Sequence, residues 1–145
     1  SGFSESIKEC VLNKKIPVLG ICLGMQLLCE CSEEGNKKGL GLVSAEVLHL
    51  NDSSRRELKI PHMGWNTLDI TRCNPLLEND PEEQRFYFVH SYYVKPNASE
   101  LCIAKTLYGS EFCSAFNSDN IFGVQFHPEK SHRFGISLMK KFVNI

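Results

Sequence analysis

A cysteine between two glycines is the residue in this sequence best placed to act as a nucleophile. Cys22 lies in the segment Gly-Ile-Cys-Leu-Gly at residues 20–24, after an apolar run and before a helical pattern. This arrangement is typical of a nucleophile elbow, in which the side chain sits on a strained turn and glycines allow close backbone approach. The helix that follows directs its N-terminal dipole at Cys22, so we expect the pKa of this thiol to be lowered. A buried structural cysteine is the alternative interpretation.

A histidine and a carboxylate two residues apart supply the base that such a cysteine needs. His127 and Glu129 flank a proline directly after the apolar run 121–125. Residues two apart in an extended segment project to the same side, so Glu129 can orient the imidazole ring and stabilise its charged form. Loops at strand ends carry the sites of many α/β folds, which favours a functional pair over a surface ion pair. The cysteine and histidine motifs lie near opposite ends of the chain, so only the fold can bring them together.

The elements that must position these residues follow the pattern of an α/β domain. Residues 4–13 and 24–31 have helical periodicity and enclose a short apolar strand at 17–21, and such rapid alternation is typical of a layered sheet with flanking helices. We expect Ser4 to cap the first helix and residues 131–143 to form a closing helix. Further strands are expected at 42–50, 59–61, 86–90, 92–95, 101–107, 111–116 and 121–125, with loops at 35–41, 51–56 and 79–84.

The composition is that of a soluble globular domain and excludes several classes of function. Lys and Arg number 16 against 17 Asp and Glu, with no long block of one sign, so neither nucleic acid nor an anionic membrane is an expected partner. No apolar run approaches the roughly 20 residues that cross a bilayer, and no signal peptide is apparent. Seven cysteines in no regular spacing predict free thiols in a reducing cytoplasm and no metal site.

Two longer segments resemble the class I glutamine amidotransferases. They are residues 20–28, Gly-Ile-Cys-Leu-Gly-Met-Gln-Leu-Leu, and residues 125–131, Gln-Phe-His-Pro-Glu-Lys-Ser. The resemblance extends over the whole chain, with four motifs in the order of the family. It implies a flavodoxin-like layered sheet with flanking helices, forming one type 1 glutamine amidotransferase domain over residues 1–145.

The resemblance also implies a mechanism that agrees with the residues. Cys22 would attack the side-chain amide of L-glutamine, with His127 as base and Glu129 as the third member of the triad. The backbone N–H of Leu23 would be one donor to the tetrahedral oxyanion. His127 would then protonate the departing ammonia before water hydrolyses the thioester. This chemistry requires no cofactor.

The family likeness further indicates which residues surround the substrate. Gln26 would line the glutamine pocket together with a short segment formed by His90, Ser91 and Tyr92. Gln26 follows Cys22 by one helical turn, so it can face the same cleft. A solvated helix face is the alternative interpretation for Gln26.

A segment with the only tryptophan predicts a protein partner. Residues 61–66, Pro-His-Met-Gly-Trp-Asn, would expose an apolar patch if they form a surface loop, and such patches usually mark interfaces. A core tryptophan is the alternative. Family members that share this segment and the segment 87–92 dock it on a synthase (cyclase) subunit in a heterodimer, near the ammonia passage. The interface residues implied in this way are Met63, Trp65, Asn66, Tyr87 and Lys130.

Two departures from the family pattern concern the glutaminase activity of the domain and the identity of the molecule that accepts the ammonia. Family members begin with a strand and a glycine-rich loop that supplies a second oxyanion donor, so we expect this domain to lack both and to show glutaminase activity near background. Residues 130–135, Lys-Ser-His-Arg-Phe-Gly, resemble members that serve synthases of surface-polysaccharide sugars. We favour ammonia delivery for histidine biosynthesis. The alternatives are surface-sugar synthesis, a cysteine hydrolase of related fold and a non-catalytic binding protein.

Overall fold

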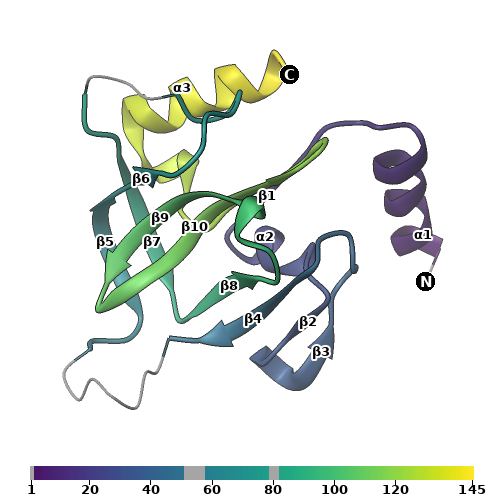
Figure 1. The fold of residues 1–145 in the computed structure, drawn as a ribbon, viewed down its shortest axis with the longest axis horizontal. Helices are drawn as coiled ribbons and strands as arrows, with labels where there is room; N and C mark the ends of the chain where they lie inside the picture. The colour runs from purple at the N-terminus through teal and green to yellow at the C-terminus, as the bar shows by residue number, and fades with distance from the viewer. Residues whose placement is uncertain (1, 51–57, 79–81) are drawn as a thin grey trace.

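The computed structural model describes residues 2–50, 58–78 and 82–145, and it forms an α/β fold around a mixed sheet (Figure 1). The predicted loop 51–56 and the first part of the loop 79–84 lie outside the described residues. The helices are α1 (Gly2–Lys8), α2 (Leu23–Leu27) and α3 (His132–Val143), with single turns at η1 (Glu9–Asn13), η2 (Glu34–Asn36), η3 (Ser99–Leu101) and η4 (Pro128–Lys130). The strands are β1 (Val18–Ile21), β2 (Cys31–Ser32), β3 (Lys37–Lys38), β4 (Ala45–His49), β5 (His62–Thr67), β6 (Asp69–Ile70), β7 (Arg85–His90), β8 (Tyr92–Pro96), β9 (Cys102–Tyr108), β10 (Ser110–Ser118) and β11 (Ile121–Val124).

The order of strands brings the two ends of the chain together. The main sheet runs β1-β11-β10-β8-β4-β2-β3, with β9 paired to β10 and to β6. β1 and β11 are parallel, in a register that sets Ile21 beside Val124. The residues that follow each strand, Cys22 and Gln125, therefore emerge at the same edge of the sheet. A separate two-stranded sheet of β5 and β7 lies at the end of the molecule opposite α1 (Figure 1).

Two apolar clusters pack on the two faces of the main sheet. Ile121 and Phe122 are neighbours on β11 but belong to different clusters, as expected for side chains on opposite faces. One cluster includes Met25 of α2, while the other includes Leu138 of α3. Each helix thus covers one face and fixes the position of the loop that precedes it.

Most predicted elements are confirmed, and the differences have identifiable causes. The strands 42–50, 86–90, 92–95, 101–107, 111–116 and 121–125 and the closing helix 131–143 correspond to β4, β7, β8, β9, β10, β11 and α3. The predicted cap at Ser4 is wrong, because α1 already begins at Gly2. The helix predicted over 24–31 is also wrong beyond Leu27, since the carbonyl oxygens of residues 27–29 accept hydrogen bonds from the backbone of residues 40–43.

The segment that was expected to be a loop at 61–66 is a strand. β5 pairs with β7 over its full length, with Trp65 opposite Tyr87. The alternation of buried and exposed side chains explains this result. His62 is buried whereas Met63 and Trp65 are exposed, as in a strand with one solvated face. The strand predicted at 59–61 is therefore displaced towards the C-terminus. The short strands β3 and β6 were not predicted, and β3 falls within the expected loop 35–41.

The close approach of β1 to α2 generates a stability prediction. A Cβ atom at Gly20 would lie 2.7 Å from the backbone carbon and oxygen of Gly24, whereas a Cβ atom at Gly24 would meet nothing within 4 Å. We expect Gly20→Ala to lower the free energy of unfolding by about 1–3 kcal/mol, the usual range for overpacking. Gly24→Ala is the matched control and should be neutral or slightly stabilising, since alanine favours helices. Urea denaturation of both variants measures the difference, and equal losses would contradict the steric argument.

Candidate active site

Cys22 occupies the strained turn that the sequence predicted between β1 and α2. Its φ of 52° and ψ of −107° lie outside the regions that non-glycine residues ordinarily adopt. The conformation is held from both sides, because the Cys22 N–H donates to Val124 O at 2.8 Å and its carbonyl accepts from the Gln26 N–H. Such imposed strain is typical of functional positions, and it is the backbone geometry of a nucleophile elbow.

The thiol of Cys22 is protonated at rest. Burial raises its pKa, and this effect outweighs the hydrogen bonds from the Leu23 N–H and the Gln125 amide, which lower it. The charges of Glu129 and Glu34 raise it further. The expectation of a lowered pKa is therefore wrong: α2 has only five residues, so its dipole is too short to compensate for desolvation. A nucleophile in this state needs a base.

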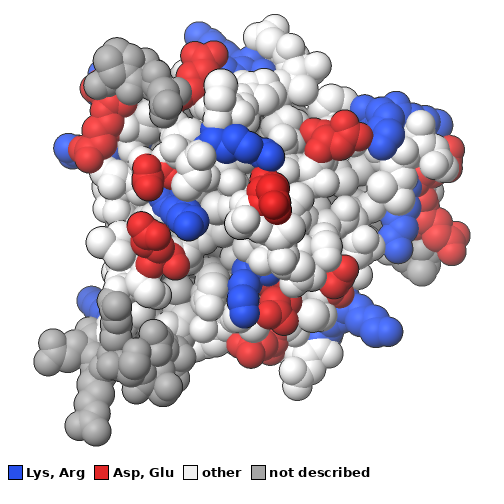
Figure 2. Space-filling model, in the orientation of Figure 1, with Lys and Arg blue, Asp and Glu red and all other residues white. Residues whose placement is uncertain are grey.

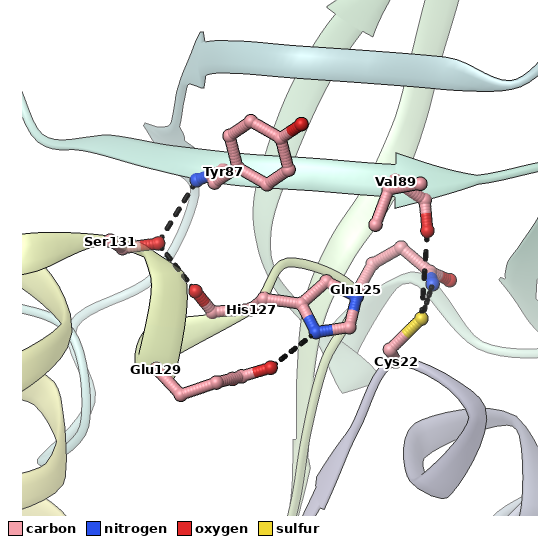
Figure 3. A network of polar contacts seen from close by, with 7 residues as sticks. All are labelled: Cys22, Tyr87, Val89, Gln125, His127, Glu129 and Ser131. Atoms are coloured by element: carbon pink, nitrogen blue, oxygen red, sulfur yellow. Dashed lines mark hydrogen bonds and ion pairs between the residues drawn. The ribbon is translucent and has the colours of Figure 1, made fainter.

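His127 and Glu129 form the pair from which that base can come (Figure 3). The Nδ1 atom of His127 lies 2.6 Å from Glu129 Oε1. A carboxylate only accepts hydrogen bonds, so Nδ1 carries a hydrogen, and the tautomer of the neutral ring that fits this contact has its lone pair on Nε2. Nε2 is buried and has no hydrogen-bond partner among the described residues. In Figure 3 the ring lies between Glu129 and Cys22, which is the order of a triad.

Ser131 fixes the segment that carries the histidine, a role that the sequence analysis missed. Its hydroxyl is fully buried, donates to His127 O at 2.6 Å and accepts from the Tyr87 N–H at 3.0 Å (Figure 3). The His127 N–H in turn donates to Tyr87 O at 2.9 Å. These three bonds attach the residues after β11 to β7. Ser131 belongs to the motif at residues 125–131, but nothing in that pattern indicated that its side chain is buried and hydrogen-bonded to two backbone segments.

Two glutamine side chains connect the nucleophile to the neighbouring strand. Gln26 is 7% exposed, so the alternative of a solvated helix face is wrong. Its amide donates to Tyr92 O at 3.4 Å and to Gln125 Oε1 at 3.3 Å. Gln125 is fully buried and its own amide donates to the Cys22 sulfur at 3.6 Å. The sequence analysis gave Gln125 no role, although its spacing of two from His127 was the signal that both face the site.

His90 is engaged on both ring nitrogens. Its Nδ1 donates to Tyr92 O at 2.7 Å, and its Nε2 accepts from His62 Nδ1 at 2.9 Å. His62 Nε2 then accepts from the Asn66 amide at 3.2 Å. Burial lowers the pKa of both histidines to about 4, so both rings are neutral near pH 7. Ser91 and Tyr92 are half-buried, and their carbonyl oxygens accept hydrogen bonds within the fold, Ser91 O from the Leu50 N–H and Tyr92 O from Gln26 and His90.

A cavity of about 360 Å³ opens beside the nucleophile. Leu23 and Gln26 form one part of its wall, and Glu34 with Lys37 forms another. Glu34 is the only acidic residue that lines it within the described ranges, and its charge reaches Cys22. Glu34 was not predicted as a site residue, because it lies in a stretch of sequence with no motif. A larger groove of about 660 Å³ follows α3 and borders Glu129; Cys22 itself lines neither this groove nor the smaller cavity, which it reaches through its neighbour Leu23.

The predicted interface residues gather on one exposed surface, with one exception. We call Met63, Trp65, Tyr87, Lys130 and His132 the aromatic patch. Trp65 is 47% exposed and Met63 62%, so the alternative of a core tryptophan is wrong. The Trp65 ring stacks on His132 with centroids 5.5 Å apart and meets the Tyr87 ring edge-on at 6.1 Å, and Lys130 Nζ lies 5.9 Å from the Tyr87 centroid.

The exception is Asn66, whose side chain points away from the aromatic patch. Its amide donates to Leu107 O at 3.0 Å as well as to His62. Its own carbonyl oxygen accepts from the Thr67 N–H at 2.8 Å. Asn66 is thus fully engaged at the end of β5.

Neither the surface charge seen in Figure 2 nor the metal-ligating side chains of the described residues indicate a further site. Lys and Arg alternate with Asp and Glu over the face shown in Figure 2. No group of three or more His, Cys, Asp or Glu in the described ranges could hold a metal ion. None of the helices described is both long and apolar enough to cross a membrane.

The hydrogen-bonded pair of His62 and His90 predicts that the stability of the fold depends on pH. Both rings have folded pKa values near 4, below the unfolded value of about 6.5. The unfolded chain therefore binds protons first, and stability is lost as the pH falls from about 6.5 towards 4, by an amount of the order of 3 kcal/mol per ring. Urea denaturation at several pH values measures the free energy of unfolding, which should fall less steeply with decreasing pH in His62→Gln than in the unaltered protein. The exposed His132→Gln is the control, and an unchanged slope in His62→Gln would contradict the assignment.

Comparison with known proteins places this geometry in a family. A model of the family "Glutamine amidotransferase class-I" matches residues 2–145. The chain is 45% identical to the "Imidazole glycerol phosphate synthase subunit HisH" of Leptospira borgpetersenii, over 100% of this chain and 72% of that protein. It is 49% identical to the "Imidazole glycerol phosphate synthase subunit HisH 2" of Methanococcus maripaludis, over 98% of this chain and 69% of that protein.

Solved structures share the fold at low sequence identity. A glutamine amidotransferase from Thermotoga maritima superposes with a TM-score of 0.62 at 20% identity, over 99% of this chain and 52% of the other. A second glutamine amidotransferase gives a TM-score of 0.70 at 16% identity, over 99% of this chain and 67% of the other. The chain therefore belongs to the class I glutamine amidotransferases and, among them, to the family of HisH subunits.

Proposed function

We propose that this chain is the glutaminase subunit of an imidazole glycerol phosphate synthase. It hydrolyses L-glutamine to glutamate and ammonia, and the ammonia passes to a synthase (cyclase) subunit in histidine biosynthesis. The observation that carries the chemistry is the buried, partner-free Nε2 of His127 in the tautomer that Glu129 fixes, beside Cys22 on its strained turn. The HisH relatives support the histidine pathway over a surface-sugar acceptor and over a different cysteine hydrolase.

The reaction begins with proton transfer from the thiol. Because burial keeps Cys22 protonated, His127 Nε2 takes the proton as the sulfur attacks the side-chain carbonyl carbon of glutamine. The Leu23 N–H, which already hydrogen-bonds the Cys22 sulfur, is one donor to the developing oxyanion. The imidazolium, stabilised by Glu129, then gives its proton to the departing ammonia. Water attacks the thioester, with His127 again as base, and glutamate leaves.

The cavity of about 360 Å³ beside Cys22 is our proposed glutamine site. The carboxylate of Glu34 suits the α-ammonium group of the substrate, as an opposite charge within the same cavity. Gln26 lies at the wall between this cavity and the sulfur. Its hydrogen bond to Gln125 holds the amide that faces Cys22. His90, Ser91 and Tyr92 do not line this cavity; Tyr92 is connected to it through its carbonyl oxygen, which accepts from Gln26.

The aromatic patch is our proposed surface for the synthase subunit, in a heterodimer of one glutaminase and one synthase. Exposed aromatic residues that stack on each other are rigid and have little conformational entropy to lose on binding. Tyr87 belongs to this patch through its ring, and its backbone holds His127 and Ser131. The aromatic patch and the base are therefore both attached to Tyr87 of β7, the patch through its ring and the base through its backbone. All seven cysteines are free, which supports a cytoplasmic location.

The triad assignment predicts graded losses of glutaminase activity. In a full-length version in complex with its synthase, Cys22→Ala should lower kcat by at least about 10⁴-fold while glutamine still binds, because the nucleophile is absent. Glu129→Gln should lose less, since the nucleophile and base remain. Cys31→Ala removes an exposed thiol of β2 and serves as the control. Ammonia release is measured directly, and near-normal turnover by Cys22→Ala would exclude this cysteine as nucleophile.

The interface assignment predicts a selective loss of association. Trp65→Ala should weaken binding to the synthase subunit by about 2 kcal/mol or more, the scale of an aromatic anchor, with little change in the free energy of unfolding. Leu12→Ala removes a similarly exposed apolar residue (46%) from η1 and should leave binding unaltered. Titration calorimetry and urea denaturation separate the two effects. Unchanged affinity with a destabilised chain would assign Trp65 to the fold instead.

A further inference from the structure

A series of buried hydrogen bonds leads towards the Cys22 sulfur, and the backbone carbonyl of Tyr92 lies at its centre. The Nδ1 atom of His90 lies 2.7 Å from Tyr92 O, and the amide nitrogen of Gln26 lies 3.4 Å from the same oxygen. A carbonyl oxygen only accepts hydrogen bonds, so both contacting nitrogens must carry hydrogen. Tyr92 O therefore fixes the tautomer of His90 and the orientation of the Gln26 amide together.

The orientation of Gln26 decides that of Gln125. The amide nitrogen of Gln26 also lies 3.3 Å from Gln125 Oε1, and only the oxygen end of the second amide can accept there. The amide nitrogen of Gln125 is then directed at the Cys22 sulfur, 3.6 Å away. A reversed Gln125 amide would set two NH₂ groups against each other. Gln26 is 7% exposed and Gln125 is fully buried, so water does not compensate for a lost bond.

His90 is held in turn by His62, the first residue of β5. The Nδ1 atom of His62 lies 2.9 Å from His90 Nε2. Because Nδ1 of the neutral His90 ring carries the hydrogen, its Nε2 accepts and His62 donates. Burial lowers the pKa of both rings to about 4, so these donor directions do not change near pH 7. His90 thus offers a constant donor to Tyr92 O.

The Cys22 sulfur lies between two polar groups that respond in opposite ways to its ionisation (Figure 3). The resting thiol donates to Val89 O at 3.8 Å, whereas the Gln125 amide donates to the sulfur. Once the thiol has given its proton to His127, the contact with the Val89 carbonyl becomes unfavourable. The bond from Gln125 becomes charge-assisted and therefore stronger. Gln125 can hold the thiolate after the bond to β7 is lost.

We propose that Gln125 is a catalytic donor to the Cys22 thiolate, and that Gln26 and His90 are positioning residues that keep its amide directed at the sulfur. These roles depend on the proposed function, because they presuppose Cys22 as the glutaminase nucleophile. The hydrogen bond from Gln125 is stronger to the thiolate than to the thiol. It therefore lowers the barrier to attack and has little effect on the binding of glutamine.

Two variants of Gln125 test the donor in a full-length version in complex with its synthase. Gln125→Met keeps the size of the side chain without its amide, and Gln125→Glu keeps an acceptor for Gln26 but has no donor near pH 7. The rate of Cys22 alkylation by iodoacetamide is measured against pH by peptide mass spectrometry. We expect its midpoint to rise by about one pH unit or more in both variants, because a hydrogen bond to a charged group is lost. We also expect kcat for glutamine to fall about ten-fold or more, with KM changed by less than about three-fold.

Gln84→Met is the matched control. Gln84 is also buried, at 8% exposed, and its amide donates to Glu78 O at 2.7 Å. This variant should leave both the alkylation midpoint and kcat unchanged. An unchanged midpoint in Gln125→Met would overturn the proposal. Absence of glutaminase activity in the unaltered complex would count against the proposed function instead, since alkylation is measured without glutamine.

Two variants of His90 test the positioning role. In His90→Asn the new amide can replace Nδ1 as the donor to Tyr92 O, whereas His90→Leu provides no donor. We expect His90→Leu to lower kcat about five-fold or more and His90→Asn to retain most of the activity. Equal losses in the two variants would assign His90 to the fold alone. If His90→Leu does not fold, the alkylation midpoints of the Gln125 variants and the activity of His90→Asn decide.

Discussion

The parallel pairing of β1 with β11 is the constraint on which the site depends. Four residue pairs join the two strands, and the ladder continues past the end of β1 through the bond from the Cys22 N–H to Val124 O. The nucleophile is therefore attached by its own backbone to the strand that leads into His127. A slip of one residue in this register would reverse the side from which each side chain projects. The buried side chains on both faces of β11 resist such a slip.

Burial and hydrogen bonding act against each other around the nucleophile. Desolvation keeps the thiol neutral, while the amide of Gln125 and the Leu23 N–H are already directed at the sulfur. These donors stabilise negative charge, so they favour the state that follows proton transfer more than the resting state. The site is thus arranged for negative charge on sulfur and oxygen that would appear only during the proposed reaction.

The sequence predicted the parts of the site that depend on short spacing. The strained turn at Cys22 and the contact between His127 and Glu129 follow from a glycine-flanked cysteine and from the two-residue period of an extended segment. Tertiary hydrogen bonds explain what was missed: the backbone of residues 40–43 ends α2 at Leu27. The sign of the Cys22 pKa shift was missed for the same reason, since the depth of burial is a property of the assembled fold.

Tyr87 combines two roles through different parts of the residue. Its ring lies in the aromatic patch, while its N–H and carbonyl oxygen hold Ser131 and His127. The two hydrogen bonds use only main-chain atoms, which every residue except proline provides. A substitution of the Tyr87 side chain would therefore change the chemistry of the proposed partner surface while leaving the two main-chain bonds to His127 and Ser131 available.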